Sequence, residues 1–419
     1  MSEKRRGTGP PNHLSRKARP GVDPTEEMIE RAVRSSMGKD GWTVLELDLQ
    51  AVQRRGVERS HIFRARLGQG DRTRRATLVA HTGNRRPPGS TQPAIIAGHK
   101  IFVWRYPSDP FMPGLPAVTS NHRVRKLLDG FDVGPGQPSL IRRVYRPTRR
   151  AVIQADLHDG DPEQIHDTVY IKVLGDRQAP KIAERTDELV RIHRELAEAG
   201  LPVPRIVGVR AELGIFATAN VPGDTLRRSI LDAESMPTPA DVAALALAMA
   251  EVDLPTGANP PRYAEPSRHA TTIGQILPEE RARAIGLVKA CAFEAPLVTV
   301  HGDFHDGQVL VQDGQITGLI DVDGVGKGHL ASDAGRMIAY VESIGDIERS
   351  DNATVEAYVA GLRAAFADHV DEDTLGRAVG AAWIALATGP HRRQQEQWRE
   401  QTVTRLDHAE RWLRDTGAL

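Results

Sequence analysis

The stretch from Val298 to Asp323 constrains the fold most strongly, because it alternates short apolar runs with polar turns. One apolar run ends at His301, the next turn presents Asp303, and Gln308 precedes a second apolar run. A further β-like run ends at Asp321. Short apolar runs bounded by Gly and Asp predict strands joined by turns. The sequence therefore places a histidine, carboxylates and an amide at strand ends.

Carboxylate and amide oxygens in this arrangement suit phosphoryl transfer. That reaction needs a carboxylate to orient the attacking hydroxyl, and oxygen ligands to hold Mg²⁺ on the phosphates. We expect Asp303, Gln308 and Asp321 to converge on one metal-bound triphosphate. The sequence thus favours an enzyme that uses a nucleoside triphosphate, and it leaves open whether ATP or GTP is preferred.

Two other interpretations of this region are weaker. His301 and His305 have the i, i+4 spacing of zinc ligands on a helix, but the intervening glycine and the turn context favour a structural His301. Residues 324–328 resemble part of a P-loop. Asp321 stands where the first glycine of that motif belongs, and no Ser or Thr follows the lysine, so the P-loop is rejected.

Composition narrows the class of partner and the compartment. Lys plus Arg (55) balance Asp plus Glu (55), so no basic field favours nucleic acid. Cys291 is the only cysteine and cannot form an internal disulfide; we expect a buried thiol and a cytoplasmic setting. No apolar run approaches the roughly 20 residues that cross a bilayer. The expected chain has no nucleic-acid or membrane partner, and its oligomeric state is left open.

Shifts in composition divide the chain into four segments. Residues 1–24 mix Pro, Gly and basic residues without periodicity and are expected to be a disordered tail. Residues 25–130 begin with a helical pattern and continue with β-rich runs, which predicts a small α+β cap or accessory unit. A Gly/Pro linker over 130–137 places a boundary near residue 130. Residues 131–222 are expected to be rich in strands, and residues 223–419 to be mainly helical.

A single lysine lies inside an otherwise apolar predicted strand, residues 169–174. Burying the Lys172 charge without a partner would be costly. The predicted helix over 180–199 offers Glu188, with Glu184 one turn earlier on the same face as the alternative. We choose Glu188. The simpler reading is that Lys172 extends from an edge strand into solvent.

These blocks resemble the aminoglycoside phosphotransferase and choline kinase-like superfamily, distant relatives of the protein kinases. The resemblance rests on the His301–Asp303 block, the Ile320–Asp321 block and supporting features over about residues 138–415. It implies an α+β, bilobal protein kinase-like fold. The β-rich N-lobe would be residues 131–222 and the helical C-lobe 223–419, preceded by the small α+β unit.

The resemblance implies a role for each matching residue. Asp303 would be the catalytic base, His301 the scaffold of the catalytic loop, Gln308 and Asp321 the Mg²⁺ ligands, Lys172 and Glu188 the phosphate-binding ion pair, and Thr218, Ala219 and Asn220 the adenine contacts. The superfamily usually has Asn at the position of Gln308. A maltokinase-like branch tends to have Gln there, and this tilts the reading toward that branch.

Two further departures from the superfamily affect loops. Residues 328–333 lack the first Asp and the Pro of the usual motif, and Asp333 is expected to anchor the next helix. No glycine-rich loop is present, because residues 146–150 occupy the turn of the first predicted hairpin. Arg149 or Arg150 could contact phosphate, although an exposed arginine is the simpler interpretation.

The sequence leaves the acceptor open. We expect transfer of the ATP γ-phosphate to a hydroxyl of a sugar, aminosugar or aminoglycoside; the alternative is a pseudokinase that regulates by binding nucleotide. Aromatic residues are only 5% of the chain, which disfavours an aromatic cage for choline. Sugar-stacking candidates are Trp383, Trp398 and Trp412, although core positions are preferred, and candidate partners for amino groups are Glu342, Asp346, Glu348, Glu396 and Glu400.

Overall fold

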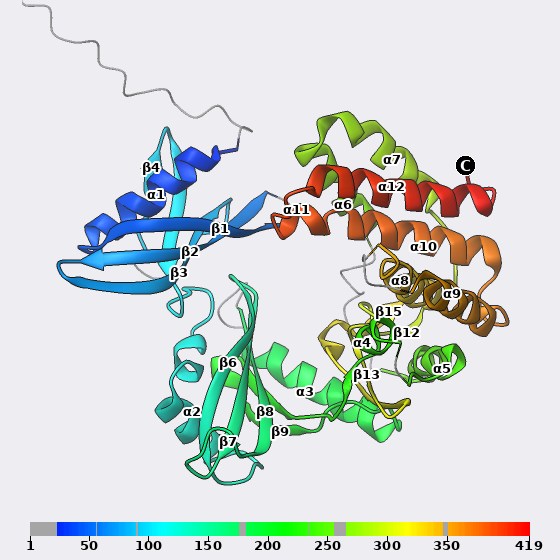
Figure 1. Cartoon of the computed structure of the whole chain (residues 1–419), viewed down its shortest axis with the longest axis horizontal. Coiled ribbons are helices and arrows are strands. Elements are labelled where there is room, and N and C mark those ends of the chain that lie inside the picture. The colour runs from blue at the N-terminus through cyan, green and yellow to red at the C-terminus, as the bar shows by residue number, and fades with distance from the viewer. Residues whose placement is uncertain are drawn as a thin grey trace, which may run out of the picture. The chain divides into compact units, whose positions relative to one another are not determined.

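The computed structural model describes residues 23–55, 57–88, 91–175, 182–233, 235–254, 265–346 and 351–419. Most of the predicted tail, residues 1–22, therefore lies outside the described part. The chain divides into two compact units, Met1–Pro110 and Phe111–Leu419. Each unit is described by itself (Figure 1).

The first unit is a twisted antiparallel sheet with one helix on its face. The elements are α1 (Glu26–Lys39), β1 (Thr43–Arg55), β2 (Glu58–Gln69), β3 (Arg72–Thr82), β4 (Ala94–Ile96) and β5 (His99–Arg105), with strand order β1-β2-β3-β5-β4. Thr25 caps α1 by accepting a hydrogen bond from the Met28 amide. The apolar stripe of α1, which includes Ile29 and Val33, packs against Phe63 and the other core residues of the sheet. The α+β unit predicted from the sequence is present.

The two units meet after Pro110, about twenty residues before the boundary that the Gly/Pro linker near residue 130 predicted. The 3₁₀ helix η1 (Leu115–Val118) and α2 (Asn121–Leu128) belong to the second unit, where α2 packs against β6 (Gln137–Arg146). The Phe131 ring lies against Gly208, leaving no room there for a side chain. Burial of these apolar groups ties the Gly/Pro linker to the second unit instead of leaving it as a hinge.

The β-rich part of the second unit is a single antiparallel sheet in the order β6-β7-β8-β10-β9. Its remaining strands are β7 (Arg150–His158), β8 (Ile165–Leu174), β9 (Ile206–Arg210) and β10 (Ile215–Ala219). Helix α3 (Ile182–Glu198) packs on β9 and β10 through a small core that includes Leu189 and Phe216. Figure 1 shows α3 beside this sheet. The hairpin, the third strand and the helix predicted here are all confirmed.

The C-terminal part is helical apart from two small sheets. Its helices are α4 (Leu226–Leu231), α5 (Pro239–Ala250), α6 (Pro266–Ile276), α7 (Arg281–Ala290), α8 (Leu330–Glu342), α9 (Asn352–Phe366), α10 (Glu372–Ala387), α11 (Gly389–Arg392) and α12 (Trp398–Asp415). One sheet joins β11 (Asp224–Thr225), β13 (Val309–Gln312) and β14 (Gln315–Leu319), and the other joins β12 (Val298–Val300) to β15 (Gly326–Gly328). The segment that resembles a P-loop fragment thus ends in a strand paired with β12.

A large apolar core holds the helical lobe together, with α10 packed between α8 and α12 (Figure 1). Trp383 is fully buried and Trp412 is nearly so, which confirms the core interpretation of these two indoles. Cys291 is also buried in this core, and burial raises the pKa of its thiol to about 12. In the described ranges, no helix combines the length and apolar character of a membrane span. The α+β class, with a β-rich lobe followed by a helical lobe, is confirmed.

Candidate active site

The loop after β12 is held in place by a carboxylate from α8. Asp333 accepts hydrogen bonds from the backbone amides of His301 (2.6 Å) and Gly302 (3.0 Å). Gly302 has a φ of +78°, a conformation that favours glycine. Burial raises the pKa of Asp333, while His301 and the two amides act in the opposite direction. Asp333, in the first turn of α8, therefore ties the loop after β12 to this helix.

His301 connects this loop to the next one. Its Nδ1 accepts a hydrogen bond from the Asp303 amide (3.3 Å), so its Nε2 carries the hydrogen and donates to the Ile320 carbonyl (3.0 Å). The ring is buried, with 1% of its surface exposed. These contacts fit the scaffold role expected of His301 and leave neither ring nitrogen for a metal.

The Asp303 side chain faces an arginine from α8. Arg336 Nη1 lies 3.3 Å from Asp303 Oδ1, and both side chains are largely buried. Burial alone would lower the pKa of Arg336, but Asp303, Tyr340 and Asp333 together raise it. Arg336, which the sequence analysis did not single out, thus holds the carboxylate in a fixed orientation.

Gln308 lies at the junction of the two loops. Its backbone carbonyl accepts a hydrogen bond from the Ile320 amide (2.9 Å), and its side-chain Nε2 lies 3.2 Å from His305 Nε2. The Gly307 amide donates to His305 Nδ1 at 3.0 Å, so in the neutral ring the hydrogen lies on Nε2. His305 Nε2 then donates to the oxygen of the Gln308 amide, which faces it when the amide is turned by 180°, and the second lone pair of that oxygen is left to bind a metal.

Asp321 occupies an unusual backbone conformation next to two cations. Its φ is +60°, in the left-handed region that Asp enters more readily than most side chains, and such conformations concentrate at functional sites. Arg150, from the start of β7, forms a bidentate ion pair with it, Nη1 to Oδ1 at 2.7 Å and Nη2 to Oδ2 at 2.8 Å. Lys172 Nζ lies 3.5 Å from Oδ1. The β-rich lobe thus reaches the helical lobe through Asp321.

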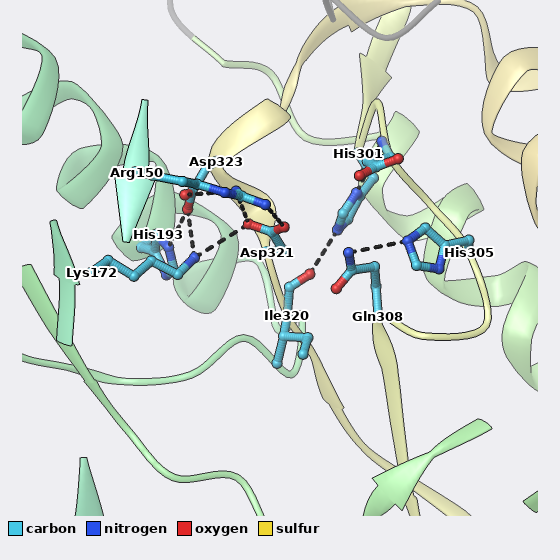
Figure 2. Close-up of polar contacts among 10 residues, drawn as sticks. Arg150, Lys172, His193, His301, His305, Gln308, Ile320, Asp321 and Asp323 are labelled. Atoms are coloured by element: carbon cyan, nitrogen blue, oxygen red, sulfur yellow. Dashed lines mark hydrogen bonds and ion pairs between the residues drawn. The ribbon is translucent and has the colours of Figure 1, made fainter. Parts of the chain in front are cut away.

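The second carboxylate of this loop, Asp323, binds Lys172 more closely. Lys172 Nζ donates to Asp323 Oδ1 at 2.7 Å, and His193 Nε2 lies 3.9 Å from the same oxygen. Burial would lower the pKa of Lys172, but Asp323 and Asp321 raise it. Burial would raise the pKa values of both aspartates, yet the facing cations hold them below their usual range. Figure 2 shows this charge cluster on one side of Ile320 and the His301, His305 and Gln308 side chains on the other.

The predicted ion pair between Lys172 and Glu188 is wrong. The structure pairs this lysine with Asp323 and Asp321 instead. Glu188 is half-buried on α3 and Glu184 is exposed. The inward stripe of α3 runs through Thr186, Leu189, Ile192, His193 and Leu196. His193 therefore occupies the position facing the site that was expected of Glu188. The 3.6-residue periodicity of that stripe was the available signal.

The predicted adenine-binding segment, residues 218–220, covers the end of β10, an inner strand of the sheet, and the residue after it. Thr218 is buried within the strand. The Ala219 amide donates to the Arg205 carbonyl (2.9 Å) and the Asn220 amide to the Thr168 carbonyl (3.0 Å). Both amides are thus engaged by the protein. A contact between this segment and adenine stays a prediction.

The donors around Asp321 suit a hard cation. Carboxylate oxygens from Asp321 and Asp323 and the Gln308 amide oxygen match the oxygen ligands that Mg²⁺ prefers, and Mg²⁺ typically takes only one or two carboxylates together with phosphates. Across the described ranges, no three His, Cys, Asp or Glu side chains gather as a metal cluster. Both Asp321 oxygens are engaged by Arg150 here, so this pair has to open before they can bind a metal.

Two of the five candidate partners for amino groups are engaged by other side chains. Glu342 accepts hydrogen bonds from the indole nitrogens of Trp383 and Trp412, each at 2.8 Å, and pairs with Arg411. Asp346 Oδ1 lies 3.5 Å from the Nε2 of His408. Glu396 and Glu400 are exposed, Trp398 is half-buried, and Glu348 lies outside the described residues.

The β-rich lobe carries an internal lysine, and strand-end carboxylates of the helical lobe face it, an arrangement typical of kinase-like folds. The sequence comparison agrees: residues 167–369 match the phosphotransferase enzyme family, a group that includes the aminoglycoside phosphotransferases. The matched segment is just under half of the chain. No curated protein matches the sequence significantly.

The chain also matches solved phosphotransferase structures, with TM-scores below 0.5. An aminoglycoside-3'-phosphotransferase of type VIII is 19% identical, with 59% of this chain and 94% of that chain covered and a TM-score of 0.41. A spectinomycin phosphotransferase in complex with ADP and spectinomycin is 14% identical, with 72% and 99% covered and a TM-score of 0.47. A thermostable aminoglycoside phosphotransferase mutant in complex with AMP-PNP and hygromycin B is 13% identical, with 71% and 99% covered and a TM-score of 0.49.

Proposed function

We propose that this protein is an ATP-dependent small-molecule kinase that moves the γ-phosphate to a hydroxyl group, with Asp303 as the catalytic base. The observation that carries this proposal is the meeting of Lys172, from the middle of a strand, with Asp321 and Asp323, from a loop of the other lobe. A lysine and a carboxylate brought together across two lobes are what nucleotide phosphates and their metal require.

Asp303 has the surroundings of a residue that orients a hydroxyl. Its carboxylate is 18% exposed, so it is held by Arg336 yet remains open to a substrate. A carboxylate in this position can accept the proton of an attacking hydroxyl, and its fixed orientation brings the oxygen into line with the phosphorus.

The nucleotide side supplies charge and positioning. Lys172 and Arg150 are the cations that face the phosphates, and Asp321 with Gln308 are the proposed holders of Mg²⁺. When bound, Mg²⁺ supplies neutralisation of the charge on the phosphate oxygens. The 3.6 Å contact of Arg150 Nη1 with Asp323 gives this arginine an alternative partner when Asp321 releases it.

One observation favours a second candidate, a pseudokinase that binds nucleotide without metal. Arg150 engages both oxygens of Asp321, so its guanidinium already neutralises the carboxylate that would hold the metal. In that reading Arg150 and Lys172 bind the phosphates directly.

One experiment separates the two candidates. Nucleotide binding is measured by isothermal titration calorimetry with and without Mg²⁺, and ADP release is measured with maltose, glucosamine, aminoglycosides and choline. Binding that strengthens with Mg²⁺, together with ADP release that depends on an acceptor and is lost in Asp303→Asn, supports the kinase. Equal binding in EDTA without turnover on any acceptor supports the pseudokinase and overturns the proposal.

A further inference from the structure

The part of the helical lobe around Asp303 and Tyr340 is rich in arginine. The arginines concerned are Arg227 on α4, Arg336 on α8, Arg392 and Arg393 at the end of α11, and Arg405 on α12. Arg336 lies nearest to the proposed reaction centre, 3.3 Å from the Asp303 carboxylate. Because four separate helices contribute them, the fold of the helical lobe creates this cluster and no local sequence run does.

The guanidinium groups of Arg393 and Arg405 both lie beside Gly389. A Cβ atom on Gly389, the first residue of α11, would lie 3.1 Å from Arg393 Nη1 and 3.3 Å from Arg405 Nη1. The absence of a side chain at Gly389 leaves the room that both guanidinium groups use. Two cations this close repel each other, and an anion between them would relieve that repulsion through charge-assisted hydrogen bonds.

Tyr340 connects this arginine pair to the catalytic loop. Its ring stacks on His305, with ring centroids 4.3 Å apart and planes inclined by 16°. The Tyr340 hydroxyl lies within electrostatic range of Asp303 on one side and of Arg393 and Arg405 on the other. The arginine pair and Asp303 therefore border one region of the helical lobe.

The carboxylates of the catalytic loop are already paired. Asp303 faces Arg336, and Asp306 Oδ2 lies 3.0 Å from Arg227 Nη1. Asp306 is buried, so this second pair is well shielded from solvent. Neither carboxylate is left to neutralise the remaining three arginines.

The other arginines have neutral partners. Arg393 donates to a glutamine side-chain oxygen at 3.4 Å and Arg405 to a backbone carbonyl at 2.8 Å. Among the described residues, no carboxylate lies within 4.0 Å of the guanidinium groups of Arg392, Arg393 or Arg405. Asp346 acts on Arg405 from farther away and is shared with His408. Positive charge is therefore in excess here.

The pKa values of nearby groups respond to this excess. Burial, then the charges of Arg336 and Arg392, lower the pKa of His269 to about 4. Burial and the neighbouring arginines also lower the pKa values of Arg393 and Arg405. Each effect has the sign expected of uncompensated positive charge.

We propose that the hydroxyl acceptor carries an anionic group, a carboxylate or a phosphate monoester, that docks on Arg393 and Arg405 while its hydroxyl lies at Asp303. This inference rests on the proposed kinase function. It argues against aminoglycosides as acceptors, because their ammonium groups would meet like charge. Glu342 and Asp346, which could have selected an amine, are engaged by other side chains.

The first test measures anion binding without assuming the carbon skeleton of the acceptor. Inorganic phosphate is titrated by calorimetry into protein saturated with AMP-PNP and Mg²⁺, so that the nucleotide site is filled. We expect millimolar binding that weakens about tenfold or more in the Arg393→Gln/Arg405→Gln double variant. The control is Arg399→Gln, which removes an exposed arginine near the start of α12, the helix that also carries Arg405. The Arg393→Lys/Arg405→Lys variant keeps the charge and checks folding.

The second test distinguishes the two anions. ADP release is compared for glucose, glucosamine, glucuronate and glucose 6-phosphate, which share a ring and differ in charge. A higher kcat/KM for glucuronate identifies a carboxylate, and a higher kcat/KM for glucose 6-phosphate identifies a phosphate. If glucose or glucosamine is turned over with a kcat/KM equal to or higher than that of both anionic sugars, the inference is overturned.

The outcomes of the two proposals remain distinguishable. Failure to bind AMP-PNP overturns the kinase function whether or not phosphate binds. Nucleotide binding with no phosphate binding, or with equal binding by the double variant, overturns the anionic acceptor alone. If no sugar in the panel is turned over, the phosphate titration decides.

Discussion

The two sides of Ile320 differ in how their charges are balanced. On the side of β8, Lys172 and Arg150 face Asp321 and Asp323 in a closed network of ion pairs. On the side of α8, Asp303 and Asp306 each hold one arginine, while Arg392, Arg393 and Arg405 have no carboxylate within ion-pair distance in the described residues. One side is neutral as it stands, and the other is cationic.

This difference indicates what each side requires of its ligand. A neutral network of buried pairs accepts a nucleotide only by exchanging partners, because a phosphate or a metal must replace an ion already present. A cationic surface needs no exchange and attracts an anion directly. The following predictions address the two sides in order of decreasing effect.

The largest effect is expected at Asp303. Asp303→Asn removes the carboxylate that accepts the hydroxyl proton, so turnover should fall by about 10²- to 10⁴-fold while nucleotide affinity stays within about twofold. Single-turnover ADP release and calorimetry measure the two quantities. Asp313→Asn is the matched control, since Asp313 is exposed in the turn after β13. A similar loss in the control, or none at Asp303, would rule out the role of base.

The next effect is expected at Asp333, which supports the loop without touching substrate. Asp333→Ala leaves the buried amides of His301 and Gly302 without an acceptor, and we expect it to lower the free energy of unfolding by about 3 kcal/mol. Asp333→Asn retains an acceptor oxygen and should lose less. Chemical denaturation compares the three proteins. Equal stability of the wild type and Asp333→Ala would contradict the anchoring role.

A smaller effect tests the neutral side. Arg150→Gln frees the oxygens of Asp321, so the Mg²⁺ concentration for half-maximal nucleotide binding should fall by about tenfold, equivalent to about 1.4 kcal/mol. Titration of Mg²⁺ at fixed ATP measures it. Arg142→Gln, an exposed residue on the neighbouring strand, is the control. Complete loss of nucleotide binding in Arg150→Gln would instead favour the metal-independent pseudokinase.

The smallest effect tests the cationic side through pH. The pKa of His269 in the folded protein, about 4, lies below the ordinary value of 6.5, so the unfolded chain binds more protons between these values. Stability from neutral His269 is therefore complete above pH 6.5 and is lost as the pH falls toward 4. At pH 5.5 the loss should be about 1 kcal/mol, and His269→Gln should remove it. Denaturation at pH 7 and 5.5 measures the change, with exposed His122→Gln as control. If His269→Gln loses as much stability between pH 7 and 5.5 as the wild type does, His269 is not the source of the pH dependence.

The sequence predicted the elements and much of the site because both follow local rules. Period-2 and period-3.6 patterns predicted the strands of the β-rich lobe and α3, and strand-end polar residues predicted that Asp303, Gln308 and Asp321 would cluster. Two hydrogen bonds at Ile320 join the loops that carry them, and the convergence of the three side chains on one metal stays a prediction.

The partners across the lobes could not be predicted in the same way. Lys172 pairs with Asp323, far along the chain, because packing of the lobes places that loop under β8; spacing on a nearby helix gave Glu188 instead. Arg150 was considered as a phosphate contact or, more simply, as an exposed arginine, since nothing local distinguishes a buried arginine in a hairpin from an exposed one. The convergence of Arg393 and Arg405 likewise depends on where α11 ends against α12.

The two hydrogen bonds at Ile320 also decide which contacts a ligand at Asp321 has to break. The Ile320 amide donates to Gln308 and its carbonyl accepts from His301, so the loop of Asp303 and the loop of Asp321 are joined by backbone contacts that involve neither carboxylate. Arg150, at the start of β7, instead holds Asp321 through the carboxylate oxygens themselves. A metal at Asp321 would therefore compete with the ion pair between the lobes and leave the contacts between the two loops in place.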